Sequence, residues 1–87
     1  MPALLGQYTP WDEDAIVTIS YVDPPNKQGW YLVSDSRQRI CATKNVLVAT
    51  LAEQYRIKGW RCRPVTVPGW PHRQLIGVSR AEEERAS

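Results

Sequence analysis

The sequence contains no phenylalanine, one histidine, one methionine and two cysteines. Its apolar runs fall far short of the ~20 residues that a membrane-spanning helix needs. The first residues, MPALLGQYTPWDED, lack the basic segment followed by an apolar one that is typical of a secretory signal. We therefore expect a soluble protein of the cytoplasm that makes no contact with a membrane.

Motifs for catalysis and for cofactor binding are also missing. The chain has neither type of glycine-rich phosphate-binding loop, and Cys41 and Cys62 do not have the paired spacing of a zinc site. His72 has no carboxylate near it in sequence, and the acidic residues 12–14 lie in a segment without regular periodicity. Catalytic carboxylates need a pocket that shifts their pKa. We expect a protein that is not an enzyme, with no metal, no cofactor and two free thiols.

Charge is distributed unevenly along the chain. Residues 1–26 include four Asp or Glu and no Lys or Arg. Residues 27–80 include ten Lys or Arg against Asp35 and Glu53, and residues 81–87 include three Glu and one Arg. A strongly basic segment favours anionic partners. The basic middle of the chain is therefore the first place to look for a binding surface.

The alternation of β-branched and aromatic residues predicts five strands, at 15–22, about 30–34, 38–42, 60–67 and about 73–79. The second and third of these are expected to form a hairpin. Pro64 has no backbone N–H to donate, so the fourth strand is expected at a sheet edge or with a bulge. Residues 1–14 are predicted to be an irregular arm and 81–87 a charged tail, on either side of a single domain at 15–80.

A helix is predicted at about 44–58. Its apolar residues recur at helical spacing and form one stripe: Leu47, Val48, Leu51, Ala52 and Tyr55. Thr43 is the expected N-cap, and Gly59 is the expected left-handed residue after the last turn. The order β-β-β-α-β-β predicts an α+β fold, in which the helix packs on one face of a small antiparallel β-sheet of four or five strands. The other face of that sheet is then open to solvent or to a partner.

Arginines and one tryptophan supply the candidate binding residues. In the stretch RCRPVTVPGWPHR, prolines on both sides of Trp70 predict a rigid loop tip that fixes the indole, which either projects outward to bind a partner or folds back to cap the core. Arg61 and Arg63 alternate along a strand and so share a face, and Arg37 and Arg39 have the same spacing. If the two faces coincide, the four arginines form one patch. The candidate binding residues are Arg37, Arg39, Arg61, Arg63, Trp70, His72 and Arg73.

Two kinds of partner fit these residues about equally. The planar fork of arginine matches phosphate oxygens, and an exposed tryptophan stacks on a base, which favours a small non-catalytic nucleic-acid-binding protein. Tryptophan and arginine are also the residues most enriched at protein–protein hot spots. The alternative is therefore a protein-binding accessory or inhibitor, for example a small phage-encoded protein that blocks a host protein complex. Exposed strand edges are also compatible with a homodimer.

Overall fold

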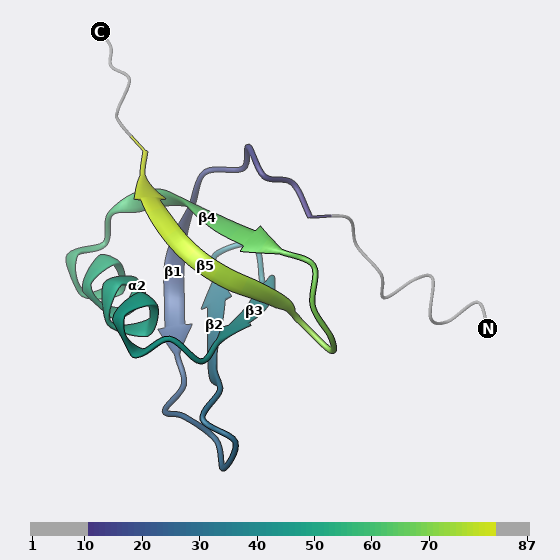
Figure 1. Cartoon of the computed structure of the whole chain (residues 1–87). Helices are drawn as coiled ribbons and strands as arrows, with labels where there is room; N and C mark the ends of the chain where they lie inside the picture. The colour runs from purple at the N-terminus through teal and green to yellow at the C-terminus, as the bar shows by residue number, and fades with distance from the viewer. Residues whose placement is uncertain (1–10, 82–87) are drawn as a thin grey trace, which may run out of the picture.

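The computed structural model describes residues 11–81, which form one helix and five strands in the expected order (Figure 1). The elements are β1 Val17–Val22, β2 Tyr31–Asp35, β3 Ile40–Thr43, α2 Val46–Lys58, β4 Arg61–Val67 and β5 Arg73–Arg80. Every predicted strand is present, and its ends lie close to the predicted ones. Residues 1–10 of the expected arm and 82–87 of the expected tail lie outside the described residues.

The strands form a closed barrel and not the open antiparallel sheet that the sequence predicts. Their order around the barrel is β1-β2-β3-β5-β4, and β4 closes it by pairing with β1, with Val17 beside Cys62. β2 and β3 form the expected hairpin. β3 and β5 run parallel, with Cys41 beside Arg73, whereas the other pairs are antiparallel. The closing contacts join strands that are far apart in sequence, so local periodicity does not specify them.

The structure agrees with the expectation for Pro64. β4 pairs with β1 only at Arg61 and Cys62 among the described residues, so Pro64 lies where β4 has one strand neighbour. Pro64 is in register with Val78 of β5, and the register of this pair shifts just after Val65. Proline is tolerated at such a position because the side of the strand without a neighbour needs no donor.

Helix α2 begins two residues later than predicted. Asn45 is its N-cap and Thr43 is not, because the Oδ1 of Asn45 accepts hydrogen bonds from the backbone N–H groups of Leu47 and Val48 at 2.8 and 3.4 Å. Thr43 is instead buried at the end of β3, where its Oγ1 accepts a hydrogen bond from the N–H of Asn45. Gly59 ends the helix as predicted, with φ at 69°.

The buried face of α2 is rotated away from the predicted stripe. Ala49, Ala52 and Tyr55 are buried, whereas Leu47 is 75% exposed and Leu51 is 38% exposed. The helix packs chiefly against β1 and β5 (Figure 1). A curved barrel wall offers a narrower contact than a flat sheet, and the small alanine side chains fit it while the leucines are left at its margin.

The core inside the barrel is built mainly of small and β-branched side chains. Alternate residues of each strand point inward, and the interior of a five-stranded barrel is narrow. The innermost apolar strand residues, each at most 4% exposed, are Val17, Ile19, Val33, Cys41, Cys62 and Leu75. Tyr55 of α2 completes this core, while Trp11 and Trp60 pack against it from outside.

The two buried thiols are free, and burial raises both of their pKa values. Cys41 is raised from 9.0 to about 12 and Cys62 to about 11, mainly because the thiolate form is desolvated and secondarily because of the Asp35 carboxylate. The folded protein therefore keeps protons that the unfolded chain begins to lose near pH 9. The stabilisation linked to these groups is complete below pH 9 and is lost as the pH rises toward 12.

We expect the free energy of unfolding to fall by about 4 kcal/mol between pH 8 and pH 10.5, because both thiols of the unfolded chain ionise over about 1.5 pH units above their pKa of 9.0, at 1.36 kcal/mol per unit and thiol. Urea denaturation followed by tryptophan fluorescence at both pH values measures this fall. The double variant Cys41→Ala, Cys62→Ala is the control. It should be less stable at pH 8 but lose less stability on going to pH 10.5, and an equally steep loss would contradict the assignment.

Candidate functional site

A groove lies between two loops of the barrel. Loop 23–30 joins β1 to β2 and loop 68–72 joins β4 to β5, at the bottom and at the lower right of Figure 1. The cavity volume of the groove is about 360 Å³. This volume is within the range of about 300–1,000 Å³ that is usual for ligand sites. The loop residues that line it are Asn26, Trp30, Gly69, Trp70, Pro71 and His72.

The floor of the groove comes from three neighbouring strands. Leu32 of β2 is the register partner of Ala42 of β3, and Ala42 is the register partner of Gln74 of β5. These three residues therefore form a row under the groove, and all three line it. The row is apolar at two positions and carries an amide at the third. The parallel pairing of β3 with β5 places Gln74 in this row. The antiparallel sheet predicted from the sequence does not include this pairing.

The first wall of the groove is a turn that holds Trp30. The Oδ1 of Asn26 accepts hydrogen bonds from the backbone N–H groups of Gln28 and Trp30, both at 2.9 Å. The N–H of Asn26 in turn donates to the carbonyl of Trp30 at 2.9 Å, and Gly29 has the left-handed φ of 89° that favours glycine. Lys44 Nζ lies 5.5 Å from the centre of the Trp30 ring, which is a cation–π contact. The indole is thus held beside a positive charge.

The second wall is the loop that carries Trp70. Trp70 is 91% exposed, so of the two possibilities left open by the sequence, the indole projects outward and does not cap the core. Gly69 has no room for a side chain, because a Cβ there would lie 2.7 Å from the carbonyl oxygen of His72 and 3.3 Å from the nitrogen of Gln74. The loop therefore folds back closely on itself. Its tip presents Trp70 to solvent, and His72 is half-buried in the wall of the groove.

Sequence reasoning missed Trp30 as a site residue. As the first residue of the predicted strand 30–34, a tryptophan fits an ordinary sheet position, where aromatic residues are common. The available signal is the turn before it, in which Asn26 and Gly29 have the spacing of a hydrogen-bonded turn. This turn predicts that Trp30 has a fixed position, but it does not predict that loop 68–72 lies across the groove from it.

The single arginine patch expected from the sequence does not form. Arg37 and Arg39 lie in the turn between β2 and β3, not on a strand. The Nε of Arg39 donates to Asp35 Oδ2 at 2.8 Å, and the Arg39 guanidinium lies 3.9 Å from the centre of the Trp11 ring. Its Nη1 also donates to the backbone carbonyl of Asp12 at 2.9 Å. Arg39 therefore fixes residues 11–12 to the barrel and is buried away from any ligand.

Arg37 and Arg73 contact the same acidic segment. Arg37 Nη1 lies 3.6 Å from Asp12 Oδ2, and Arg73 Nη2 lies 4.0 Å from Glu13 Oε2. The Nε of Arg73 also donates to Thr66 Oγ1 at 2.8 Å. Ion pairs with such exposed carboxylates contribute only ~0–1 kcal/mol. Such weak pairs leave both arginines able to exchange their carboxylate for a phosphate group.

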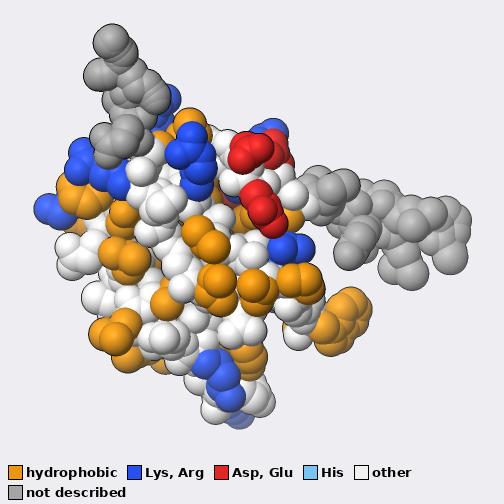
Figure 2. Space-filling model, turned by 45° about the horizontal axis from the view of Figure 1, so that its top comes forward, with side chains coloured by type: hydrophobic (Ala, Val, Ile, Leu, Met, Phe, Trp, Pro, Cys, Tyr) orange, Lys and Arg blue, Asp and Glu red, His pale blue; other side chains and the backbone are white. Residues whose placement is uncertain are grey.

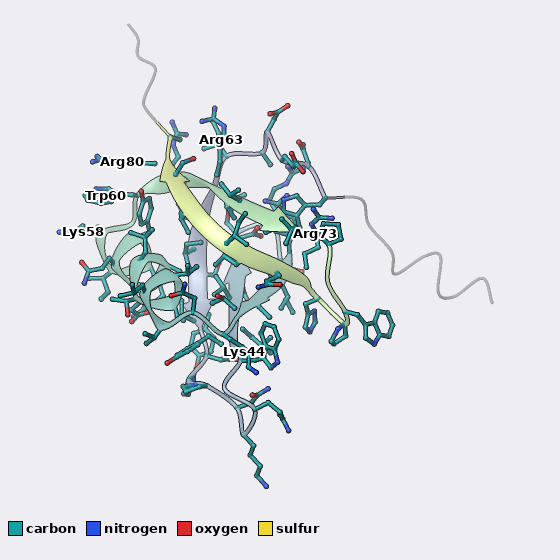
Figure 3. All side chains as sticks on the ribbon, in the orientation of Figure 1. Lys44, Lys58, Trp60, Arg63, Arg73 and Arg80 are labelled. Carbon is teal, nitrogen blue, oxygen red and sulfur yellow. The ribbon has the colours of Figure 1, made fainter. Side chains whose placement is uncertain are left out.

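Arg61 and Arg63 lie on a different part of the surface. They share the outward face of β4, as predicted, because the intervening Cys62 is buried. Figure 3 shows Arg63 at the top of the barrel near Arg80, apart from Arg73. The candidate residues thus occupy three separate places. Trp70 and His72 line the groove. Arg37, Arg39 and Arg73 contact residues 11–13, and Arg61 and Arg63 lie on the outward face of β4.

Other kinds of site are not evident in residues 11–81. In this range no three His, Cys, Asp or Glu side chains are grouped so as to hold a metal ion, and no helix is long and apolar enough to cross a bilayer. The raised pKa values of Cys41 and Cys62, about 12 and about 11, keep both thiols protonated at neutral pH. A protonated buried thiol is a poor nucleophile.

No family model matches the chain, and no curated protein or solved structure matches it either. The function therefore has to be inferred from the groove and from the charges around it.

Proposed function

We propose that the protein binds single-stranded nucleic acid and that the groove between loops 23–30 and 68–72 is its base-binding site. The observation that carries the proposal is the pair of indoles, Trp30 and Trp70, which line one groove from opposite loops above an apolar floor. Every base has a π-face, and stacking on an aromatic side chain contributes about 1–3 kcal/mol per base. Two aromatics in one groove suit adjacent unpaired bases.

Polar groups in the groove fit the edges of such bases. Gln74 is exposed at the end of the floor, and an amide offers both donors and an acceptor. The side-chain Oδ1 of Asn26 already accepts two hydrogen bonds within the turn. The N–H groups of the same side-chain amide can therefore donate to a ligand. These edges are accessible in single strands, whereas in a duplex they are paired and stacked. The groove chemistry therefore favours single strands.

Two cations lie close enough to serve the phosphates of a strand in the groove. Lys44 is held against the Trp30 ring, and Arg73 immediately precedes Gln74 in the groove floor. Figure 3 shows Lys44 below β5 and Arg73 near the start of that strand. An aromatic platform bordered by positive charge is the usual arrangement of a single-strand binding site.

The architecture of the barrel supports the same proposal. Five strands closed in the order β1-β2-β3-β5-β4 are arranged as in the OB-fold, in which the second and third strands and the loops 1–2 and 4–5 bind oligonucleotides and oligosaccharides. The groove lies at these same strands and loops. One fold hosts many functions, so the indoles and cations of the groove support nucleic-acid binding more directly than this likeness does.

Fluorescence anisotropy with labelled oligonucleotides of about 12 nucleotides tests the proposal, since OB-folds contact about 4–16 nucleotides. We expect single-stranded DNA or RNA to bind more tightly than a duplex of the same sequence. Affinity should fall between about 50 and 200 mM salt, with a slope of about 0.7 in log K per phosphate neutralised. Equal binding of single strand and duplex would contradict the groove as base site. Binding of neither would favour the protein-binding alternative.

A further inference from the structure

A second basic surface lies at the far end of β5 from the groove. It consists of four cations and one aromatic, Lys58, Trp60, Arg61, Arg63 and Arg80, and we call it the β4–β5 basic surface. β5 starts beside the groove at Arg73 and ends at Arg80, about 23 Å further along a strand that rises about 3.3 Å per residue. Figure 3 shows Lys58, Trp60, Arg63 and Arg80 gathered at this end.

Trp60 holds two of these cations in place. The Arg80 guanidinium lies 4.0 Å from the centre of the Trp60 ring, and Lys58 Nζ lies 5.2 Å from it. The Trp60 ring is itself fixed edge-on against Tyr55, with 5.4 Å between ring centres. Because cations and Tyr55 occupy the surroundings of this ring, it is not a free platform for a base. The surface therefore offers positioned charge and no base stacking.

Three cations of this surface lack a carboxylate partner within residues 11–81. Among residues 11–81, Lys58, Arg63 and Arg80 have no carboxylate partner, whereas Arg37, Arg39, Arg56 and Arg73 each have one. The pairing of β4 with β5 puts Arg80 in register with the buried Cys62, so Arg80 lies at the same end of the barrel as Arg63 but on the other face of this strand pair. Figure 2 shows Lys and Arg side chains gathered at the upper left of one face and Asp and Glu side chains at the upper right. Three cations at one end of the barrel, without counter-charges from residues 11–81, favour binding of a polyanion.

We infer that the β4–β5 basic surface binds phosphates of the same strand whose bases occupy the groove. This inference rests on the proposed function. A stacked strand carries one phosphate per about 3.4 Å, so 23 Å corresponds to about seven nucleotides, within the 4–16 nucleotides that one OB-fold contacts. Guanidinium groups with fixed geometry suit phosphate oxygens. A strand of about 12 nucleotides then contacts both sites, and one of about five fills the groove alone.

Anisotropy titrations of the two lengths against charge variants test this inference. In Arg63→Ala/Arg80→Ala, we expect about tenfold weaker binding of the 12-mer and a salt slope shallower by about 1.4, from two phosphates at about 0.7 each. Binding of the 5-mer should not change. Arg63→Ala alone, which leaves the packing around Trp60 intact, should show about half of the slope change. Arg56→Ala is the matched control, because it removes one charge from an exposed arginine that is paired with Glu53.

The possible results distinguish failure of the β4–β5 basic surface as a phosphate site from failure of the groove as a base-binding site. If the 5-mer binds and the double variant binds the 12-mer as the wild type does, the β4–β5 basic surface is not a phosphate site and the groove proposal stands. If neither length binds the wild type, the proposed function itself fails. If a glutamate peptide of matched charge displaces the 12-mer as effectively as unlabelled 12-mer, binding does not distinguish a nucleic-acid strand from any other polyanion and the inference is wrong.

Discussion

Replacing both Trp30 and Trp70 by alanine should weaken binding of a single-stranded 12-mer by about a hundredfold. Each stacked base contributes about 1–3 kcal/mol, and every 1.4 kcal/mol is a tenfold change in Kd. Each single variant is therefore expected to lose about tenfold. The slope of log K against log salt should stay as in the wild type, because neither substitution removes a charge. Anisotropy titration of the labelled 12-mer at several salt concentrations measures both quantities.

Tyr21→Ala provides the control for these tryptophan variants. Tyr21 is an exposed aromatic on β1, and it does not line the groove. Its removal should leave the Kd of the 12-mer unchanged. If Trp30→Ala and Trp70→Ala also leave the Kd unchanged, the bases do not stack in the groove. If Trp70→Ala alone abolishes binding of a protein partner that salt hardly affects, the protein-binding alternative is favoured.

Asp35→Asn should lower the free energy of unfolding by about 3–5 kcal/mol, the cost of breaking a buried ion pair. Asp35 is 4% exposed, and its carboxylate accepts hydrogen bonds from the N–H groups of Arg37 and Arg39 at 2.9 and 3.0 Å and from the Nε of Arg39 at 2.8 Å. Asparagine keeps one acceptor oxygen but removes the charge. The Arg39 guanidinium is then buried without a counter-charge. Urea denaturation followed by tryptophan fluorescence measures the loss.

Glu53→Gln is the matched control for Asp35→Asn, because it removes the same charge from an exposed pair. Glu53 bonds Arg56 on the surface of α2, and the Arg56 guanidinium lowers the pKa of this carboxyl. Solvent screens such a pair, so the urea midpoint should hardly change. Equal losses in the two variants would show that burial does not set the strength of the Asp35–Arg39 pair. Adding Arg39→Met to Asp35→Asn should recover part of the stability, since it removes the unpaired charge.

The Asp35→Asn variant also tests whether the contacts of Arg39 are independent of the groove. Arg39 fixes residues 11–12 through Trp11 and the carbonyl of Asp12. Loosening this contact should not alter the groove, whose walls are formed by loops 23–30 and 68–72. Arg39 therefore serves mainly the fold, whereas the groove and the β4–β5 basic surface are available for binding.

The sequence alone determined the local elements of this protein. Alternation predicted all five strands, Gly59 marked the end of the helix, and the prolines around Trp70 predicted a rigid loop while leaving the exposure of its indole open. These features depend on neighbouring residues, because backbone conformation, capping and loop stiffness are set within a few residues. The spacing of Arg61 and Arg63 on one face of β4 was predictable for the same reason.

The tertiary structure alone decided which of these elements meet. Closure of the barrel and the parallel pairing of β3 with β5 bring Gln74 under the groove and place Trp30 opposite Trp70. Strand pairing across long sequence separations leaves no local pattern that specifies it. The same holds for the arginines: Arg39 and Arg63 stand in similar sequence contexts, but only Arg39 faces a buried carboxylate. Whether an arginine stabilises the fold or remains available to a ligand depends on its burial and on the position of a carboxylate beside it. Both are set only when the chain folds.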